Sequence, residues 1–397
     1  MRPVFSLPVR FGISVLSFLV FRSSVSVAQS PIPPGAQLQK IAIGFSQPEG
    51  PVWKDGVGLL FSDIARSIIY SWTPEDSARP YLQPSDSSNG LTLDLQHRLI
   101  LTQMLDRRVS RQETDGTITP LVSTYNGKRF NSPNDVVVKS DGSIFFTDPD
   151  FNVPAGQKKE LTFQGVYRLS PGGILTLLDS ALTLPNGICF SPDEKKLYVN
   201  DSHLCVIYSW DVTSDSTISG KTHLYTIPAT GYADGMKTDT AGNIYCAGPT
   251  GIWIVSPSGT LLGKIAMSET PSNCNWGDAD RKTLYITAGK SLYRIRLSTT
   301  GVMSPGVLKT GSYELREGFP NPCNPGTTIG FHVPVTGFLD LTIYDTAGRE
   351  ITKLAAGIYF PGEYAEHWDT GSVPSGVYFC RLMAASFSST KKIVVLK

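Results

Sequence analysis

The stretch "FNSPNDVVVKSDGSIFFTDPDF", residues 130–151, carries the pattern from which the fold can be predicted. An Asn-Asp pair, Asn134 and Asp135, precedes a short apolar run, and after an Asp-Gly turn a second apolar run ends at Thr147 and Asp148. Two short runs rich in Val, Ile and Phe on either side of such a turn predict a β-hairpin. Strand formation alone does not explain why polar side chains precede the first strand of this hairpin.

The same pattern occurs six times along the chain, each time as a polar residue, a short strand, a turn and a second strand. The copies are "PEGPVWKDGVGLLFSD", "SNGLTLDLQHRLILTQ", "PNDVVVKSDGSIFFTD", "PNGICFSPDEKKLYVND", "ADGMKTDTAGNIYCAG" and "SNCNWGDADRKTLYITA". Their spacing of 39 to 52 residues is typical of a four-stranded propeller blade, and most copies are followed by a third strand pattern. We therefore predict an all-β chain whose residues 38–300 form a six-bladed β-propeller.

The leading polar residue of each copy falls at one equivalent position: Glu49, Asn89, Asn134, Asn186, Asp234 and Asn273. In a propeller the innermost strands begin around the central channel, so these side chains are expected to form a ring. Two carboxylates and four amides supply the oxygen ligands that a hard divalent cation such as calcium prefers. Asn and Asp before a strand also act as turn formers that bond their own backbone, and this alternative stays open for each residue.

Three further acids, Asp135, Asp148 and Asp201, sit beside these motifs, where turn chemistry would account for them. We expect Asp148 to have a structural role, in a loop or at the opposite end of the channel. The five histidines lack the spacing of a zinc hydrolase, and no nucleophile elbow, Walker loop or dinucleotide fingerprint is present.

The first 28 residues have the pattern of a signal peptide. Arg2 and Arg10 precede the apolar stretch Phe11–Phe21, and small residues follow. The stretch has 11 residues, short of the roughly 20 that span a bilayer, so we predict export and no membrane span in the mature chain. A retained N-terminal anchor is the alternative. A formal net charge of +1 without runs of like charge predicts no nucleic-acid partner.

Four motifs, "QPEGPVW", "NSPNDVVVKSDGSIFFTDP", "LPNGICFSPDEKKLYVNDS" and "ADGMKTDTAGNIY", resemble the SMP-30/gluconolactonase/luciferin-regenerating-enzyme family over about residues 38–297. The resemblance implies a six-bladed propeller with one divalent metal, usually Ca²⁺, with Mg²⁺, Mn²⁺ or Zn²⁺ as other candidates. It implies metal ligation by Glu49, Asn186 and Asp234, with Asn134 binding metal or substrate. The substrate contacts expected around them are Asn134, Ser132, Asn89 and Asn273.

The resemblance also implies a reaction. A divalent cation would polarise a lactone carbonyl, and Asp234 would accept a proton from the attacking water while Glu49 anchors the cation. We predict a secreted metal-dependent lactonase acting on a small, sugar-type lactone. Ser132 stands where animal members have an Arg that holds sugar hydroxyls, so that contact is not expected here. The alternatives are a phosphotriester or aryl-ester hydrolase at the same metal, and a non-catalytic surface propeller that binds glycan or protein.

Residues 301–312 read as a linker, and residues 313–397 as a small Ig-like β-sandwich of about seven strands. The motifs "FPNPCNPGTTI", "IYDTAGRE", "PSGVYFCRL" and the basic end "KKIVVLK" resemble the type A sorting domain of the type IX secretion system. This implies the outer-membrane secretion machinery as a partner and a secreted or cell-surface location. The oligomeric state stays open.

Six cysteines are present, and export would permit disulfides. The first four, Cys189, Cys205, Cys246 and Cys274, lie in apolar strand-like segments, which favours buried free thiols. In the sorting domain, Cys323 and Cys380 both stand where the pattern usually has aromatic residues. We therefore hypothesise a Cys323–Cys380 disulfide.

Overall fold

The computed structural model describes residues 30–151, 153–213, 216–302, 313–334, 337–359, 362–384 and 387–397. Regular structure in these residues consists of β-strands and one short 3-10 helix, η1 (Ile64–Arg66), which confirms the all-β prediction. No helix in this part of the chain has the length and apolarity to cross a membrane. The predicted signal peptide, residues 1–28, and most of the predicted linker lie outside the described residues.

Six sheets of four antiparallel strands each occupy the described residues between Gln39 and Arg296. The first three are β2 (Pro48–Lys54), β3 (Gly58–Asp63), β4 (Ile68–Trp72) and β5 (Arg79–Leu82); β6 (Ser88–Leu93), β7 (Leu99–Gln103), β8 (Arg108–Gln112) and β9 (Ile118–Val122); and β12 (Val136–Val138), β13 (Ile144–Asp148), β14 (Gly165–Leu169) and β15 (Leu175–Asp179). A two-stranded hairpin, β10 (Thr124–Tyr125) and β11 (Lys128–Arg129), lies between the second and third sheets in sequence.

The remaining three sheets complete this part of the chain. They are β16 (Pro185–Phe190), β17 (Lys196–Asp201), β18 (Val206–Val212) and β19 (Ile218–Thr226); β20 (Met236–Thr238), β21 (Ile244–Gly248), β22 (Gly251–Val255) and β23 (Leu261–Ala266); and β24 (Pro271–Gly277), β25 (Thr283–Ala288), β26 (Ser291–Arg296) and β1 (Gln39–Ile43). In the last sheet β1, from the beginning of the region, pairs with β26 from its end.

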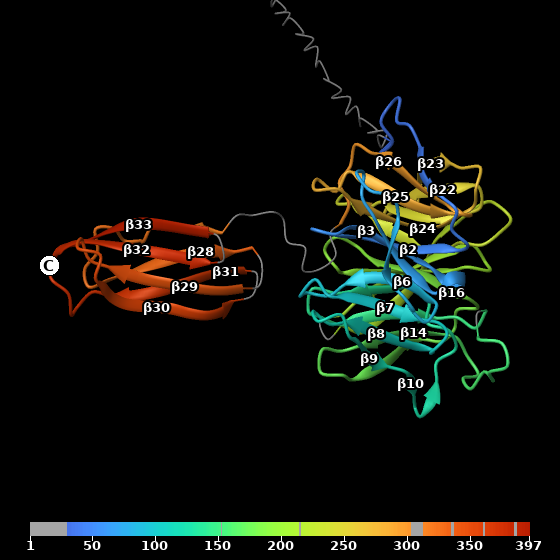
Figure 1. The fold of residues 1–397 in the computed structure, drawn as a ribbon, viewed down its shortest axis with the longest axis horizontal. Helices are drawn as coiled ribbons and strands as arrows, with labels where there is room; N and C mark the ends of the chain where they lie inside the picture. Colours follow the sequence, from blue (N-terminus) through green and yellow to red (C-terminus); the bar gives the residue numbers. More distant parts are fainter. Residues whose placement is uncertain are drawn as a thin grey trace, which may run out of the picture.

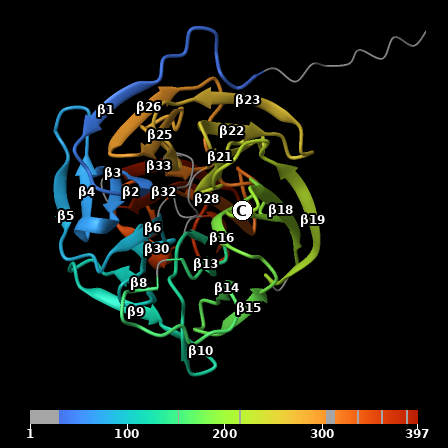
Figure 2. The ribbon, with the colours of Figure 1, turned by 90° about the vertical axis from the view of Figure 1, so that its right-hand side faces the viewer.

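The six sheets surround one axis (Figure 2). The first strand of each sheet contacts the first strand of the next, in the order β2, β6, β12, β16, β20 and β24, and β24 contacts β2 again. Apolar side chains fill the space between neighbouring sheets. Phe145 meets Phe190 edge to face with ring centroids 4.9 Å apart, and Tyr245 meets Trp276 in the same way at 4.9 Å. Each such buried side chain contributes about 1.5–3 kcal/mol to folding.

Each of the six sequence repeats corresponds to the first two strands of one sheet, but the last repeat is out of register by one residue. Pro271 pairs with Ala288 at the start of β24, as Pro48 pairs with Asp63 and Pro185 with Asp201 at the starts of β2 and β16. The Gly235 N–H donates to the Ser272 carbonyl at 2.8 Å, as the Gly90 N–H donates to the Asn134 carbonyl at 2.8 Å. Ser272, rather than Asn273, therefore occupies the backbone position of the leading residue in this sheet.

Neighbouring sheets are joined by buried hydrogen bonds from a side chain near the end of one second strand to the carbonyl of the next leading residue. The pairs are Ser62 Oγ to Asn89 O (2.9 Å), Thr102 Oγ1 to Asn134 O (2.6 Å), Thr147 Oγ1 to Asn186 O (2.7 Å) and Asn200 Nδ2 to Asp234 O (2.5 Å). Across the junction of the last and first sheets, Ser272 Oγ donates to the Pro48 carbonyl at 2.7 Å. These bonds hold the leading residues at set positions.

The C-terminal region forms two sheets of its own, coloured orange to red in Figure 1. One sheet contains β27 (Glu314–Leu315), β28 (Gly326–Val333) and β31 (Gly362–Asp369), and the other β30 (Glu350–Tyr359), β29 (Gly337–Tyr344), β32 (Gly376–Ala384) and β33 (Phe387–Val395). Their shared core includes Ile329, Phe331, Leu341 and Trp368. The predicted strands "TTIGFHV", "LDLTIYD", "AEHWD" and "GVYFCRL" lie in β28, β29, β31 and β32.

All six cysteines are buried free thiols, so the Cys323–Cys380 disulfide is absent. Cys323 lies beside Val395, whereas Cys380 pairs with Lys391, four residues away along β33. Four residues of a strand span about 13 Å. A disulfide requires Cα atoms within about 7 Å, so the strand register separates the two cysteines too widely. The first four cysteines, in contrast, have the state that the sequence predicts.

Replacing Thr147 with Val tests the bonds between sheets. Thr147 Oγ1 also accepts the Asp135 N–H at 3.1 Å, so Thr147→Val leaves two buried backbone groups unpaired while nearly preserving side-chain volume. We expect the free energy of unfolding, measured by urea denaturation, to fall by about 1–3 kcal/mol. Thr147→Ser keeps the hydroxyl, so its free energy of unfolding should fall less. Equal losses in the two variants would show that packing, and not the hydrogen bond, is responsible.

Candidate metal and substrate site

Five of the six predicted ring residues occupy equivalent positions at one end of the channel. Glu49, Asn89 and Asn186 are the second residues of β2, β6 and β16, and Asn134 and Asp234 each lie two residues before β12 and β20. All are buried except Asp234, which is partly exposed. The structure thus brings these residues together as the sequence repeat predicts.

Glycine follows the leading residue wherever the next strand leaves no room for a side chain. A Cβ built on Gly50 would lie 2.2 Å from the Asn89 carbonyl oxygen, and one on Gly187 would lie 2.4 Å from the Asp234 carbonyl oxygen. At Gly90 the corresponding distance to the Asn134 carbonyl oxygen is 2.6 Å. Real Cβ atoms do not approach backbone oxygen so closely. The "EG" and "NG" motifs therefore reflect the tight approach of neighbouring strands.

Two acids of the ring are buried close enough to affect each other. Glu49 Oε2 accepts the Gly50 N–H at 2.7 Å and the Asn273 amide at 3.1 Å. Burial raises the pKa of Glu49, and the charge of Asp135 adds to this increase. Burial and the charge of Glu49 raise the pKa of Asp234 well above its ordinary value. Like charges in such a place favour a proton or a cation between them.

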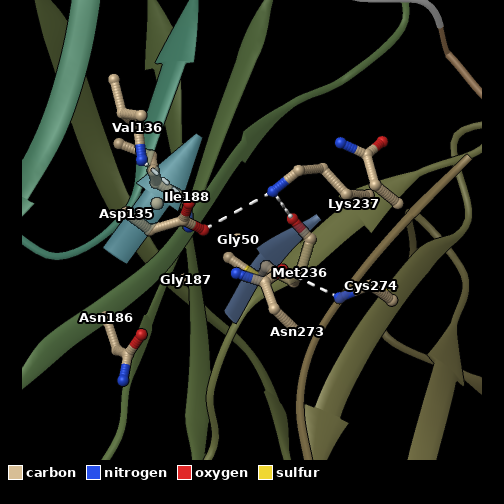
Figure 3. Close-up of polar contacts among 12 residues, drawn as sticks. Gly50, Asp135, Val136, Asn186, Gly187, Ile188, Met236, Lys237, Asn273 and Cys274 are labelled. Atoms are coloured by element: carbon tan, nitrogen blue, oxygen red, sulfur yellow. Dashed lines mark hydrogen bonds and ion pairs between the residues drawn. The ribbon is translucent and has the colours of Figure 1, made fainter. Parts of the chain in front are cut away.

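The two amides that flank these acids differ in their free oxygen atoms. Asn186 Oδ1 is buried and has no hydrogen-bond partner within the described residues. Asn273 Oδ1 accepts the Cys274 N–H at 2.8 Å (Figure 3). The amide nitrogen of Asn273 donates to Glu49. Asn186 can therefore offer an oxygen to a ligand, whereas the oxygen of Asn273 is already bonded.

This set of donors fits a hard divalent cation. Two carboxylates and a partnerless buried amide oxygen are oxygen ligands of the kind that such ions take. The parts of the chain that the structure describes contain no group of three or more His, Cys, Asp or Glu placed to hold a metal. A cation bound here would therefore depend on amide oxygens in addition to Glu49 and Asp234.

Asp148 lies at the same end of the channel as Asn134, and the expectation of the opposite end was wrong. β13 runs antiparallel to β12, so its last residue returns to the start of β12. Asp148 accepts the N–H groups of Asn131 at 2.8 Å and Ser132 at 2.7 Å, which is the expected structural role. Ser132 Oγ is buried and without a partner in the described structure, so it is free to bond a ligand.

Sequence reasoning missed an ion pair in the channel wall. Asp135 Oδ2 lies 3.5 Å from Lys237 Nζ, and Figure 3 shows the two side chains pointing toward each other from different strands. Turn chemistry explains only part of Asp135, whose Oδ1 accepts the Val136 N–H at 2.9 Å. Two signals could have revealed the pair: Asp135 stands where four other copies have Gly, and Lys237 interrupts a buried strand.

Gly187→Ala tests how tightly the strands approach at the site. The added methyl group would collide with backbone of the Asp234 segment, and such overpacking costs about 1–3 kcal/mol. We expect this loss in the free energy of unfolding from denaturant titration. Gly172→Ala is the matched control, because its Cβ would have only Ser170 Oγ at 3.9 Å, and it should change stability by less than about 0.5 kcal/mol. Similar values for both variants would contradict the tight approach.

Asp148 should also make stability depend on pH. Burial raises the pKa of Asp148 to about 7, so between its ordinary value and about 7 it is protonated when folded and ionised when unfolded. The folded state then binds more protons, and the contribution of Asp148 to stability falls as pH rises through this range. We expect the free energy of unfolding of wild type, minus that of Asp148→Asn, to decrease from about pH 4.5 to about pH 7.5, by at most about 1.4 kcal/mol per pH unit. Parallel pH profiles of the two proteins would contradict this assignment.

Each of the two regions of the chain matches a known protein family. Residues 47–290 match the SMP-30/gluconolactonase/LRE-like region, and residues 318–396 match the secretion system C-terminal sorting domain. The gluconolactonase of Zymomonas mobilis is 33% identical over 293 residues, which cover 66% of this chain and 82% of the relative. The pentonolactonase of Haloferax volcanii is 25% identical over 248 residues, covering 60% of this chain and 80% of the relative.

Solved structures agree with these matches. A gluconolactonase from Xanthomonas campestris superimposes with a TM-score of 0.63 at 32% identity, over 67% of this chain and 91% of its own. The calcium-binding protein regucalcin from Agrobacterium tumefaciens superimposes with a TM-score of 0.57 at 16% identity, over 66% and 93%, and shows the shared fold alone. The matched sorting domain indicates export to a secreted or cell-surface location. The chain belongs to the SMP-30/gluconolactonase/LRE-like family.

Proposed function

We propose that this protein is an exported, metal-dependent lactonase that opens a small, sugar-type lactone. The observation that carries the proposal is the placement of the buried Glu49 and the partly exposed Asp234 beside the partnerless Asn186 oxygen at one end of the channel. The lactonase relatives from Zymomonas mobilis and Haloferax volcanii and the gluconolactonase fold support the reaction class.

The proposed domain organisation follows the sheets. Residues 38–300 would be a six-bladed β-propeller in which each four-stranded sheet is one blade, and residues 313–397 an Ig-like sandwich that serves the outer-membrane secretion machinery. Residues 1–28 would be a signal peptide and residues 301–312 a linker. Closure of a propeller by pairing the two ends of the chain is how such folds remove exposed sheet edges, and the β1–β26 pair supports this interpretation.

Glu49, Asn186 and Asp234 would hold the cation, with Asn134 as a further ligand or a substrate contact. Ca²⁺ is the leading candidate because all the donors are oxygens, and Mg²⁺, Mn²⁺ and Zn²⁺ are the others. A divalent cation bound there would supply Lewis-acid polarisation of the lactone carbonyl.

The protein's own groups would do the rest of the chemistry. The Asp234 carboxylate would accept the proton of the attacking water, which its place beside Glu49 and its raised pKa suit. Asn89, Asn134 and the free hydroxyl of Ser132 would contact the polar groups of the lactone. Asn273, with both ends of its amide bonded, would hold Glu49 in place and would not meet the substrate through its oxygen.

Asp234→Asn separates catalysis from metal binding. The amide keeps one oxygen for the cation but cannot take a proton, so we expect kcat to fall by about 10²-fold or more, in line with loss of a general base. Because loss of the Asp234 charge also weakens metal binding, metal affinity is measured by calorimetry and kcat is compared at saturating metal. Asp115→Asn, in the exposed turn between β8 and β9, is the control and should keep the parent rate.

The assay uses the full chain, sugar and aliphatic lactones, a phosphotriester and an aryl ester, with chelator and then each candidate metal. Turnover of lactones that chelator abolishes and one metal restores would support the proposal. Faster turnover of the phosphotriester or aryl ester than of any lactone would show that the enzyme belongs to that hydrolase class and is not a lactonase. Metal binding without turnover of any ester would leave a binding protein, and an Asp234→Asn variant as fast as the parent would exclude the proposed base.

A further inference from the structure

The Asp135–Lys237 ion pair lies within the same channel as the candidate metal ligands. Asp135 belongs to the third sheet and Lys237 to the fifth, so the pair connects two sheets that are not neighbours. Both side chains are buried, with 2% of Asp135 and 14% of Lys237 exposed. Lys237 Nζ also donates to the Met236 carbonyl at 3.0 Å. Charges that are largely removed from water interact more strongly than charges at the surface.

Lys237 is charged in this environment. Burial lowers its pKa, but the neighbouring Asp135 carboxylate acts against burial, and the pKa of Lys237 lies above its ordinary value. The pair adjoins two candidate ligands, because Asp135 directly follows Asn134 and its Oδ2 accepts the N–H of Ile188, two residues after Asn186, at 3.4 Å. Asp135 raises and Lys237 lowers the pKa of Glu49, and Asp135 raises that of Asp234.

The charges in this part of the channel have a definite sum. With both candidate ligands ionised, as metal ligation requires, three carboxylates, from Glu49, Asp234 and Asp135, face one ammonium group, from Lys237, and the formal charges sum to −2. One divalent cation balances this charge. A site with the same ligands but no Lys237 would carry −3, and one without Asp135 would carry −1.

We propose that the Asp135–Lys237 pair matches the charge of the site to one divalent cation and thereby sets the charge selectivity of metal binding. The inference rests on the metal site of the proposed function, and it gives this pair a positioning role through the field that it creates. It does not require the pair to touch the cation. Loss of either partner should change the preference between cations of different charge, whereas loss of both should restore it.

The test compares Ca²⁺ and Tb³⁺ binding to the full chain by calorimetry and by terbium luminescence. A unit change in buried charge near a cation is worth roughly tenfold or more in affinity. We expect Asp135→Asn to weaken Ca²⁺ binding by about tenfold or more. Lys237→Met should strengthen Tb³⁺ binding by several-fold more than Ca²⁺ binding. The double variant, again at −2, should return the Ca²⁺ to Tb³⁺ affinity ratio close to that of wild type.

Two further variants guard against effects of misfolding. Lys237→Arg keeps the positive charge and should keep the wild-type affinity ratio. Asp135→Gly introduces the residue that four other copies have at this position and should act like Asp135→Asn. Thermal unfolding of each metal-free variant reports whether it is folded.

The outcomes separate this inference from the proposed function. If the folded single variants bind both ions within about twofold of wild type, the pair is structural only and the inference is overturned. If the affinity ratio shifts as expected but no lactone is hydrolysed, the inference holds and the proposed reaction fails. If wild type binds neither ion while it still hydrolyses lactones, the charge-matching inference fails and the reaction proceeds without this metal site.

Discussion

The first strands of neighbouring sheets approach so closely that a backbone carbonyl occupies the place where a Cβ atom would be. At Gly50, Gly90 and Gly187 the next strand leaves room for hydrogen only. The same three carbonyl groups accept hydrogen bonds from Ser62, Thr102 and Asn200 of the preceding sheet. Because the carbonyl belongs to the leading residue, one contact sets both the packing of two sheets and the direction of one site side chain.

This packing has an electrostatic consequence. Glu49 and Asp234 lie on strands that cannot move apart without breaking contacts with the strands beside them. Burial raises the pKa of both acids and the charge of Glu49 raises that of Asp234 further, and the backbone cannot relax to relieve these effects unless a positive charge is present. Lys237 supplies one such charge, but its own partner Asp135 cancels it. The demand for a further cation follows from the rigidity of the ring as much as from the acids themselves.

The sequence was sufficient for the parts of the fold that depend on local chemistry. Alternating apolar residues around Asp-Gly turns identified the first two strands of every sheet, because strand period and turn preference are encoded within about fifteen residues. The repeat also identified Glu49, Asn134, Asn186 and Asp234 as residues that meet. It placed Asn273 one position out of register, because Ser272 and Asn273 are both polar and only the strand pairing shows which of them holds the leading position.

What the sequence could not show were contacts that depend on how strands and sheets align with one another. Asp135 looks like a turn residue until Lys237 is placed opposite it, and Asp148 looks remote from Asn134 until antiparallel pairing returns its strand to the channel end. Cys323 and Cys380 share a core but differ in strand register, which composition does not report.

Each of these contacts depends on how strands align across the ring or sandwich, and the same alignment brings the site together. Thr147 and Asn200, which donate hydrogen bonds to the carbonyls of Asn186 and Asp234, therefore control the positions of these candidate ligands without being ligands themselves. Substitutions at the ends of the second strands are expected to alter the site as directly as substitutions in the ligand motifs.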